Sequence, residues 1–170
     1  MAYPEILILR HLSRRPAHGY ELRKRIEDTT GIVLNNNSLY PALRRFVEAG
    51  AVSMTVEHQD PKPPRHVYEL TDVGRELLHD LLADLPAAQA GDDLEFLTRL
   101  GQFMFLTPEE REPILAARER TLSEVVARFG QLQRRARGEF WSEAVVDRLR
   151  RQAEDEIAWL HELRAELDRP

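Results

Sequence analysis

The sequence predicts a mainly α-helical protein with two domains, a mixed domain over residues 1–85 and an all-helical domain over residues 86–170. Two observations lead to this fold class. Apolar residues recur every three or four positions through most of the chain, as in helices, and the period falls to two only between residues 51 and 70. The boundary is placed by residues 85–93, where Pro and small residues end one helix and acidic residues open another.

Two short helices are expected first. Pro16 ends one of them, and the other lies between Gly19 and the helix-stopping Gly31. The inward positions, which have helical spacing, are Ile6, Leu9 and Leu12 in the first and Tyr20, Leu22 and Ile26 in the second.

A third helix opens at Asn35–Ser38, a run of good N-cap residues, and Pro41 is expected in its first turn. Gly50 is the expected stop after its C-terminus. The inward stripe of this helix is Leu39, Leu43, Phe46 and Val47.

A hairpin and a fourth helix complete the first domain. Residues 51–57 and 66–70 read as strands, and the three prolines within residues 59–65 predict the loop between them. Thr71 then caps a helix whose apolar residues are Leu77, Leu78, Leu81 and Leu82. Three helices, a two-stranded hairpin (the wing) and a closing helix are the element order of a winged helix-turn-helix.

The second domain is predicted to be helical throughout. Its helices cover residues 94–106, begin again at Thr107 with the start signal Thr-Pro-Glu-Glu, and begin a third time near Glu139. The last two carry apolar residues at steps of three and four, as in a coiled coil, so we expect them to pair with a second copy. The dimer-interface candidates are Val146, Leu149, Ile157, Leu160, Leu163 and Leu167.

Composition excludes several classes of protein. The chain has 170 residues, a formal net charge of −5, 42% hydrophobic residues and 31% charged residues. This hydrophobic fraction is too high for an acidic disordered chain. No stretch approaches the roughly 20 apolar residues of a membrane span, and the first residues lack the basic region of a signal peptide. The absence of cysteine excludes disulfides, thiolate zinc sites and cysteine nucleophiles. We therefore expect a soluble, cytoplasmic protein with no membrane partner.

Charge is unevenly distributed along the chain. Residues 14–65 hold nine cationic and six acidic side chains, whereas residues 66–170 carry a net negative charge. Because salt screens charges over roughly 10 Å, a nearby phosphate responds mainly to the local cations. The distribution is therefore compatible with DNA binding by the helix-turn-helix, despite the negative total.

In a helix-turn-helix, the N-terminal turn of the second helix enters the major groove. Asn pairs with adenine and Arg with guanine, whereas hydroxyl groups are suited to phosphates. We expect Arg45 to contact the DNA backbone, and Lys62 and Arg65 at the hairpin tip to reach phosphate or the minor groove. The DNA-contact candidates are Asn36, Asn37, Ser38, Tyr40, Arg44, Arg45, Lys62 and Arg65.

These candidates also have simpler interpretations. The run Asn35–Asn37 is first of all a helix cap, and Tyr40 is as well suited to packing under the hairpin as to a phosphate contact. Arg44 and Arg45 fit an ordinary solvated helix face, and the prolines fit a stiff turn.

Neither catalysis nor metal binding is expected. The sequence has no Gly-rich phosphate loop and no Gly-x-Ser-x-Gly elbow, and its six histidines lack the spacing of metal ligands. We therefore expect no catalytic residue, no metal and no cofactor. The alternative to a DNA-binding protein is a winged-helix adaptor that binds another protein, and the acidity of the chain supports it.

Three stretches are specific in combination: residues 17–22 (AHGYEL), residues 38–50 (SLYPALRRFVEAG) and residues 65–74 (RHVYELTDVG). Together they resemble the PadR family of bacterial transcriptional regulators, over most of residues 4–82. The resemblance implies a homodimeric winged-helix regulator, commonly a repressor, that binds an inverted-repeat operator and often responds to a small, frequently aromatic effector. The Pro-rich hairpin loop and the asparagines before Ser38 differ from the family's usual residues. The aromatic candidates for an effector pocket, which also fit a helical core, are Phe103, Phe105, Trp141 and Trp159.

Overall fold

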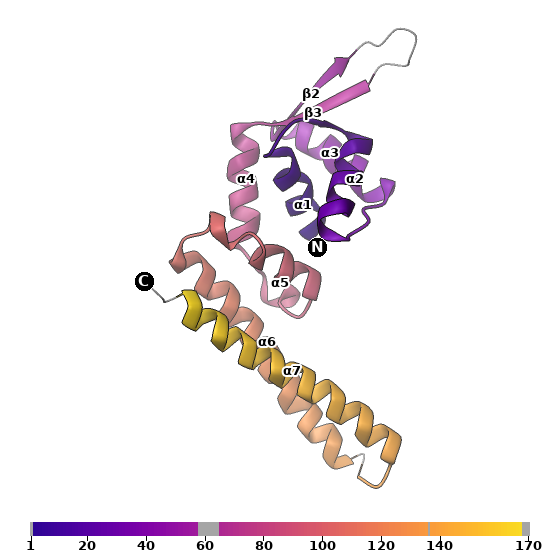
Figure 1. Ribbon diagram of the computed structural model, residues 1–170, viewed down its shortest axis with the longest axis vertical. Helices are drawn as coiled ribbons and strands as arrows, with labels where there is room; N and C mark the ends of the chain where they lie inside the picture. The colour runs from indigo at the N-terminus through magenta and orange to yellow at the C-terminus, as the bar shows by residue number, and fades with distance from the viewer. Residues whose placement is uncertain (1, 58–64, 136, 168–170) are drawn as a thin grey trace. The chain divides into compact units, whose positions relative to one another are not determined.

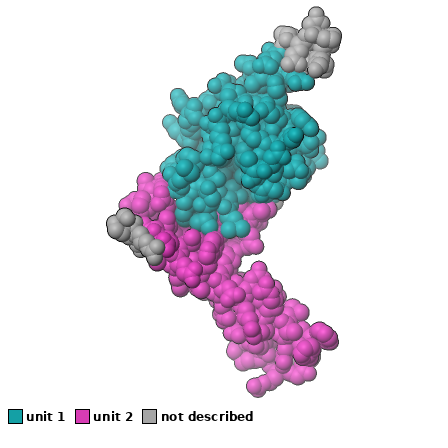
Figure 2. Space-filling view, viewed as in Figure 1, with its two compact units in different colours: residues 1–84, 97–105 teal, residues 85–96, 106–170 magenta. Residues whose placement is uncertain are grey.

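The computed structural model describes residues 2–57, 65–135 and 137–167, without the side chain of residue 135. The chain divides into two compact units (Figure 2): unit 1 comprises residues 1–84 and 97–105, and unit 2 comprises residues 85–96 and 106–170. Residues 97–105 therefore belong with unit 1, although they follow the boundary that the sequence predicts at residue 85.

Unit 1 begins with the three expected helices, α1 (Tyr3–Leu12), α2 (Gly19–Thr30) and α3 (Asn36–Glu48). Gly31 ends α2 in the left-handed conformation, at φ +70°, which a side chain with a Cβ rarely adopts. The inward stripes form an apolar core whose fully buried members include Ile6, Leu9, Leu22, Ile26, Leu39 and Leu43.

The start of α3 corrects one detail of the sequence analysis. Asn35 is the N-cap, because its side-chain oxygen accepts the Ser38 N–H at 2.8 Å. Pro41 is then the sixth residue of the helix and not part of its first turn. Its missing N–H leaves the Asn37 carbonyl without the usual i+4 donor, and the exposure of Pro41 lets water replace that donor.

The sheet has three strands, β1 (Ala17–His18), β2 (Val52–Glu57) and β3 (Arg65–Leu70), in the antiparallel order β1-β3-β2. The predicted wing is the β2–β3 hairpin, and β1 is an addition that is too short to produce a pattern in the sequence. Figure 1 shows the hairpin extending beyond the helices of unit 1. Met54 and Val56 are accordingly 42% and 45% exposed, and Val52 alone of the predicted inward face is buried.

Helix α4 (Asp72–Ala83) closes unit 1 as predicted. The Thr71 hydroxyl accepts the Gly74 N–H at 3.1 Å and donates to the Gly50 carbonyl at 2.7 Å, so it joins the helix start to the end of α3. Gly74 has no room for a side chain, because a Cβ there would overlap the carbonyl oxygen of Ala51.

The helix expected over residues 94–106 is shorter in the structure. Helix α5 (Asp93–Leu100) ends before Gly101, and a 3₁₀ turn, η2 (Phe103–Phe105), follows it. A second 3₁₀ turn, η1 (Ala87–Gln89), occupies the predicted seam.

Unit 2 is dominated by α6 (Pro108–Arg135) and α7 (Phe140–Leu167), which run antiparallel (Figure 1). The predicted start at Thr107 is confirmed, because its N–H donates to Glu110 Oε2 at 2.8 Å. The apolar seam lies within one chain, since Leu160 of α7 is fully buried, as is Leu115 of α6. Part of the stripe that predicts a dimer is therefore used to pair α6 with α7.

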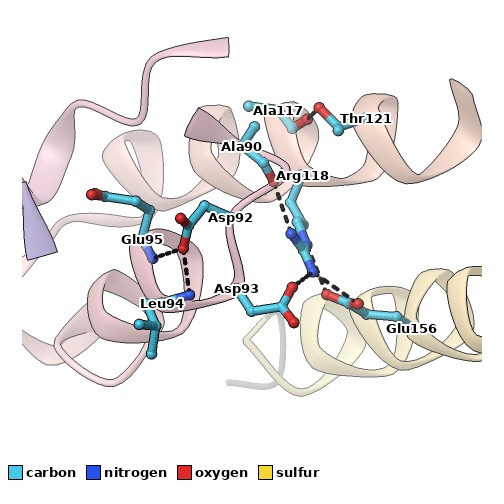
Figure 3. Close-up of polar contacts among 9 residues, drawn as sticks. All are labelled: Ala90, Asp92, Asp93, Leu94, Glu95, Ala117, Arg118, Thr121 and Glu156. Carbon is cyan, nitrogen blue, oxygen red and sulfur yellow. Dashed lines mark hydrogen bonds and ion pairs between the residues drawn. The ribbon is translucent and has the colours of Figure 1, made fainter. Parts of the chain in front are cut away.

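A buried arginine holds unit 2 together (Figure 3). Arg118 of α6 is 3% exposed and binds Glu156 of α7 through two hydrogen bonds of 2.7 and 2.9 Å. It also binds Asp93 at the start of α5 and donates to the Ala90 carbonyl at 2.9 Å. Burial alone would lower the pKa of Arg118, but Glu156 and Asp93 outweigh it and raise the pKa above its ordinary value.

Candidate nucleic-acid interface

The N-terminal tip of α3 is exposed, as the sequence predicts. Leu39 and Leu43 are fully buried, whereas Asn36 and Asn37, in the first turn of the helix, are exposed. Ser38 is half-buried, and its hydroxyl donates to Asn35 Oδ1 at 3.1 Å, so it contributes to the cap. The cap interpretation is thus correct for Asn35, while the next two asparagines keep their amides on the surface.

Two neighbouring arginines on α3 differ in their contacts. Arg45 donates to Glu5 of α1 at 2.6 Å, which offsets part of its charge. Arg44 is exposed and takes part in none of the hydrogen bonds or ion pairs found in the described part of the chain. Arg44 therefore offers a whole guanidinium on the same side of α3 as Asn37, about two turns further along the helix.

A cavity of about 410 Å³ lies beside this tip within unit 1. Tyr40 forms part of its wall and is 41% exposed. A Cβ at Gly19 would come within 2.7 Å of the Tyr40 ring, so the absence of a side chain there lets the ring pack at the start of α2. Tyr40 therefore packs against the start of α2 and still keeps much of its surface in solvent. The cavity is lined by His18, Gly19, Tyr20, Glu21, Tyr40, Arg65, His66 and Tyr68.

The pKa of Tyr68 shows how the groups around this cavity interact. Burial raises it above its ordinary value, the neighbouring Tyr40 raises it further, and the Arg44 guanidinium opposes both. Arg44 thus lies close enough to the cavity for its charge to act there.

Sequence analysis named Tyr40 and Arg65 as candidates and missed the other six residues of this cavity, among them His18, Tyr20 and His66. Tyr20 was expected inside, but it is 67% exposed, because as the second residue of α2 it lies off the stripe formed by Leu22 and Ile26. The two histidines are linked, since His18 Nδ1 lies 3.2 Å from the carbonyl oxygen of His66. The sequence does contain a signal that could have identified these residues, because a His followed two residues later by a Tyr occurs both in residues 17–22 and in residues 65–70.

The predicted hairpin cations have different outcomes. Arg65 was assigned to the loop, but it is the first residue of β3, opposite Glu57 of β2, and its side chain is exposed and lines the cavity. Pairing with β2 extends the strand by one residue beyond the pattern. Lys62 lies outside the described residues.

The dimer-interface candidates do not share one environment. Leu160 is fully buried within its own chain, Val146, Ile157 and Leu163 are half-buried, and Leu149 and Leu167 are 40% and 45% exposed. A different set of α7 side chains is open to solvent and lies within an arc of about 80° on the helix, which we call the α7 flank. It consists of Trp141, Val145, Leu149 and Trp159, which are 80%, 60%, 40% and 36% exposed.

The four aromatic effector-pocket candidates are not brought together as one group. Trp141 and Trp159 are 18 residues apart on α7, hence about 27 Å along the helix, so one small pocket in a single chain cannot hold both. Phe103 is buried in unit 1. Phe105 is 46% exposed and lies 4.6 Å below the Arg10 guanidinium.

The described residues offer neither a metal site nor a membrane span. No group of three or more His, Asp or Glu side chains is placed there to hold a metal ion. None of the helices in that part of the chain has both the length and the apolar character needed to cross a membrane.

Comparison with known proteins places this surface within a family. A profile of the transcriptional regulator PadR-like family matches residues 8–80, which contain α2, α3 and the hairpin. No curated protein matches the chain in sequence.

Solved structures are also similar to the chain. One is a PadR family transcriptional regulator from Eggerthella lenta, with 34% identity over 46% of this chain and 64% of that one (TM-score 0.40). A proposed transcriptional regulator from Thermoplasma acidophilum is 36% identical over 45% of this chain and 72% of that one (TM-score 0.41). Bacillus subtilis PadR, crystallised with operator DNA, is 19% identical over 95% of this chain and 96% of that one (TM-score 0.45).

Proposed function

Because the chain belongs to the PadR-like family of transcriptional regulators, we propose that it is a homodimeric repressor that binds an inverted-repeat operator through α3. Members of this family are transcriptional regulators and not enzymes, in agreement with the expectation that no residue is catalytic. The observation that carries the proposal is the exposed surface of α3, which holds Asn36, Asn37 and, two turns on, Arg44, a cation in none of the ion pairs of the described residues. The structure similar to this chain from B. subtilis was crystallised with operator DNA, and duplex DNA is the partner that we propose here.

Base recognition falls to the side chains at this tip. A helix that enters the major groove by its N-terminal turn presents those side chains to base edges. The Asn36 or Asn37 amide can bind adenine through two hydrogen bonds, and the Arg44 fork can bind guanine in the same way. Arg45, already bound to Glu5, is assigned to the DNA backbone.

We assign contacts with the DNA backbone to the cavity beside α3. Its polar side chains come from β1, α2, α3 and β3, and Arg65 supplies a fixed positive charge. Tyr20 and Tyr40 carry hydroxyl groups that donate to phosphate oxygens, and phosphate contacts position a protein without reading sequence. Ser38 and Lys62 remain candidates for the same role.

Homodimer formation is assigned to the α7 flank. Exposed apolar side chains that adjoin on one helix are unfavourable in water, and a second copy of the flank would cover them. The two α3 helices must then lie about 34 Å apart to reach successive major grooves. An effector that binds more tightly to a dimer in which the two α3 helices have another spacing would weaken operator binding. The loss of operator affinity cannot exceed the ratio of the effector's affinities for the two states of the dimer.

The alternative, an adaptor that binds protein through the winged helix, is supported by the net charge of −5. The deciding experiment is footprinting of the purified protein on the DNA beside its own gene. We expect protection of two half-sites about 10 base pairs apart, or a multiple of that, and an affinity that falls steeply with salt. An adaptor would give no footprint at low salt, and that result would overturn the proposal.

A further inference from the structure

The hairpin of unit 1 has one strand edge without a partner. Strand β2 lies at the outside of the order β1-β3-β2, and in the described part of the chain β3 is the only strand that pairs with it. Figure 1 shows the hairpin extending beyond the helices of unit 1. Residues 53–57 of β2 are accordingly all exposed. The outer edge of β2 is therefore open to another strand.

The hydrogen-bond register shows which backbone groups of β2 face outward. The Thr71 N–H donates to the Ala51 carbonyl at 3.1 Å, so these two residues form a hydrogen-bonded pair. Such pairs alternate with non-hydrogen-bonded pairs along an antiparallel ladder, and the register of β2 with β3 continues without a break. Met54 and Val56 are thus in non-hydrogen-bonded pairs with β3, and their N–H and C=O groups point away from it.

The other side of β3 agrees with this assignment. His66 is opposite Val56, so its carbonyl group must also point away from β2, toward β1. That carbonyl oxygen lies 3.2 Å from His18 Nδ1 of β1, which donates to it. The two edges of the sheet therefore give the same alternation.

Strand β2 lacks the features that commonly prevent pairing at an edge, which are Lys, Pro and β-bulges. Residues 52–57 (VSMTVE) contain neither Lys nor Pro, and their register with β3 has no bulge. Their only charge is Glu57, at the end of the strand. Met54 and Val56 place exposed apolar side chains on one face. The edge thus combines outward backbone groups with an apolar face in solvent.

We propose that β2 pairs with the β2 strand of a second copy, antiparallel, around a two-fold axis at Thr55. Met54 of each copy then exchanges backbone hydrogen bonds with Val56 of the other, and the four side chains cover one another. Ser53 lies opposite Glu57 of the other copy, so no like charges meet. This register pairs all the exposed residues, 53–57, and leaves out the buried Val52. A second copy is the occupant because the strand is complementary to itself, and the contact is separate from the α7 flank.

A cysteine pair tests this register, because the chain itself has no cysteine. The two copies of position 55 form a non-hydrogen-bonded pair with Cα atoms about 4.5 Å apart, which a disulfide can bridge. The two copies of position 53 lie about 14 Å apart, which a disulfide cannot bridge. Under copper-phenanthroline oxidation of the full chain, Thr55→Cys should form the covalent dimer at least roughly ten-fold faster than Ser53→Cys, an exposed position on the same face of β2. Equal rates, or no cross-link at position 55, overturn the proposal.

A backbone variant separates strand pairing from chance collision. Val56→Pro removes an N–H that faces outward, so the ladder with β3 is kept. In the Thr55→Cys background we expect this change to slow cross-linking by roughly ten-fold, because the pair loses hydrogen bonds. Val56→Thr keeps the N–H and the β-branched shape and should leave the rate unchanged. An unchanged rate with Val56→Pro contradicts the pairing.

Amide hydrogen exchange tests the wild-type chain and needs no variant. The Met54 and Val56 N–H groups should exchange more slowly as the protein concentration rises, whereas the Asn37 N–H in the first turn of α3 should not change. Exchange of Met54 and Val56 that is independent of concentration overturns the proposal. None of these measurements uses DNA. Their failure with an intact operator footprint removes the strand pairing alone, and pairing without a footprint removes the proposed function alone.

Discussion

Unit 1 and unit 2 hold their arginines in different ways. In unit 2, Arg118 binds Glu156 and Asp93, and Arg164 binds Glu112 and Glu119, so each guanidinium has two carboxylate partners. In unit 1, Arg44 has no carboxylate and Arg10 has only neutral partners among the described residues. Arg118 and Arg164 therefore fix helices of unit 2 against each other, whereas unit 1, in which Arg25 and Arg45 also bind carboxylates, leaves the charges of Arg44 and Arg10 available for an anionic partner. The overall charge of −5 conceals this division.

The two units also bury apolar surface differently. Unit 1 encloses its core among four helices and a sheet, and its large apolar side chains are mostly inside. Unit 2 relies on a two-helix seam, and the α7 flank stays in solvent. A pair of helices cannot surround a core, so unit 2 is expected to gain more from a second copy than unit 1 does.

The largest effect is expected in the ion-pair network of unit 2. Glu156→Leu leaves Arg118 buried without its main partner, and breaking such a pair costs about 3–5 kcal/mol of folding free energy. Chemical denaturation followed by circular dichroism measures the loss. The control is Glu154→Leu, which removes a partly exposed pair with Arg150 and should cost about 1 kcal/mol or less. Equal losses would show that burial of Arg118 does not matter.

The next effect concerns the α7 flank. Trp141→Ser combined with Leu149→Ser should weaken the proposed dimer by at least ten-fold, because buried aromatic anchors contribute about 2 kcal/mol or more each. Light scattering over a dilution series reports the mass. Ala158→Ser, also exposed on α7 but outside the flank, should leave the dimer intact. A double variant that stays dimeric at the same dilution would assign the interface elsewhere.

A smaller loss of stability is expected in unit 1. Gly74→Ala should cost about 1–3 kcal/mol, because the added Cβ overlaps the Ala51 carbonyl and α4 must shift. Thermal unfolding measures it. Gly130→Ala is the matched control, since a Cβ there meets nothing within 4 Å, and it should be neutral or slightly stabilising. An unchanged melting temperature for Gly74→Ala would contradict the close packing of α4 on the start of β2.

The contrast between neighbouring arginines gives a test on DNA. Arg44→Ala should weaken operator binding by about 1–3 kcal/mol and relax the base preference. Arg45→Ala, which removes a cation already bound to Glu5, should have a smaller effect, and Lys62→Ala should weaken all duplexes alike. Fluorescence anisotropy on operator and scrambled duplexes separates these outcomes. Equal loss on every sequence with Arg44→Ala would reduce its role to a phosphate contact.

The smallest effect is a pH dependence of the stability of unit 1. Burial, with Arg14, Arg10 and Arg25 nearby, lowers the pKa of His11, although its hydrogen bond with the Leu7 carbonyl opposes the shift. The unfolded chain then binds the proton more readily, so this contribution is full above pH about 6.5 and is lost as the pH falls through the lower folded pKa. Denaturation at pH 8 and pH 5 measures the difference, and His11→Gln should reduce it. An identical pH dependence in the variant would assign it to other groups.

Local signals in the sequence were sufficient for most of the elements. Helix caps and stops act in the same way in any context, because caps pair backbone N–H groups and glycine adopts a positive φ. The caps are Asn35, Thr71 and Thr107, and the stops are Gly31 and Gly50. Strand β1 and the early end of α5 were missed, because each depends on contacts distant along the chain. Tyr20 was misassigned for a local reason, since Tyr20 and Leu22 are two residues apart and so lie on different sides of α2.

The sequence by itself determined the order of helices and hairpin, the exposed tip of α3 and the family to which the chain belongs, because these follow from periodicity, caps and motifs read along the chain. Only the tertiary structure decided which charges find partners. It bound Arg45 to Glu5, gave Arg44 no such partner among the described residues, buried Arg118 between two carboxylates, and brought Arg10 to Phe105 across 95 positions of the chain. Charge pairing depends on distances of a few ångströms between residues far apart in sequence, and no local pattern encodes them.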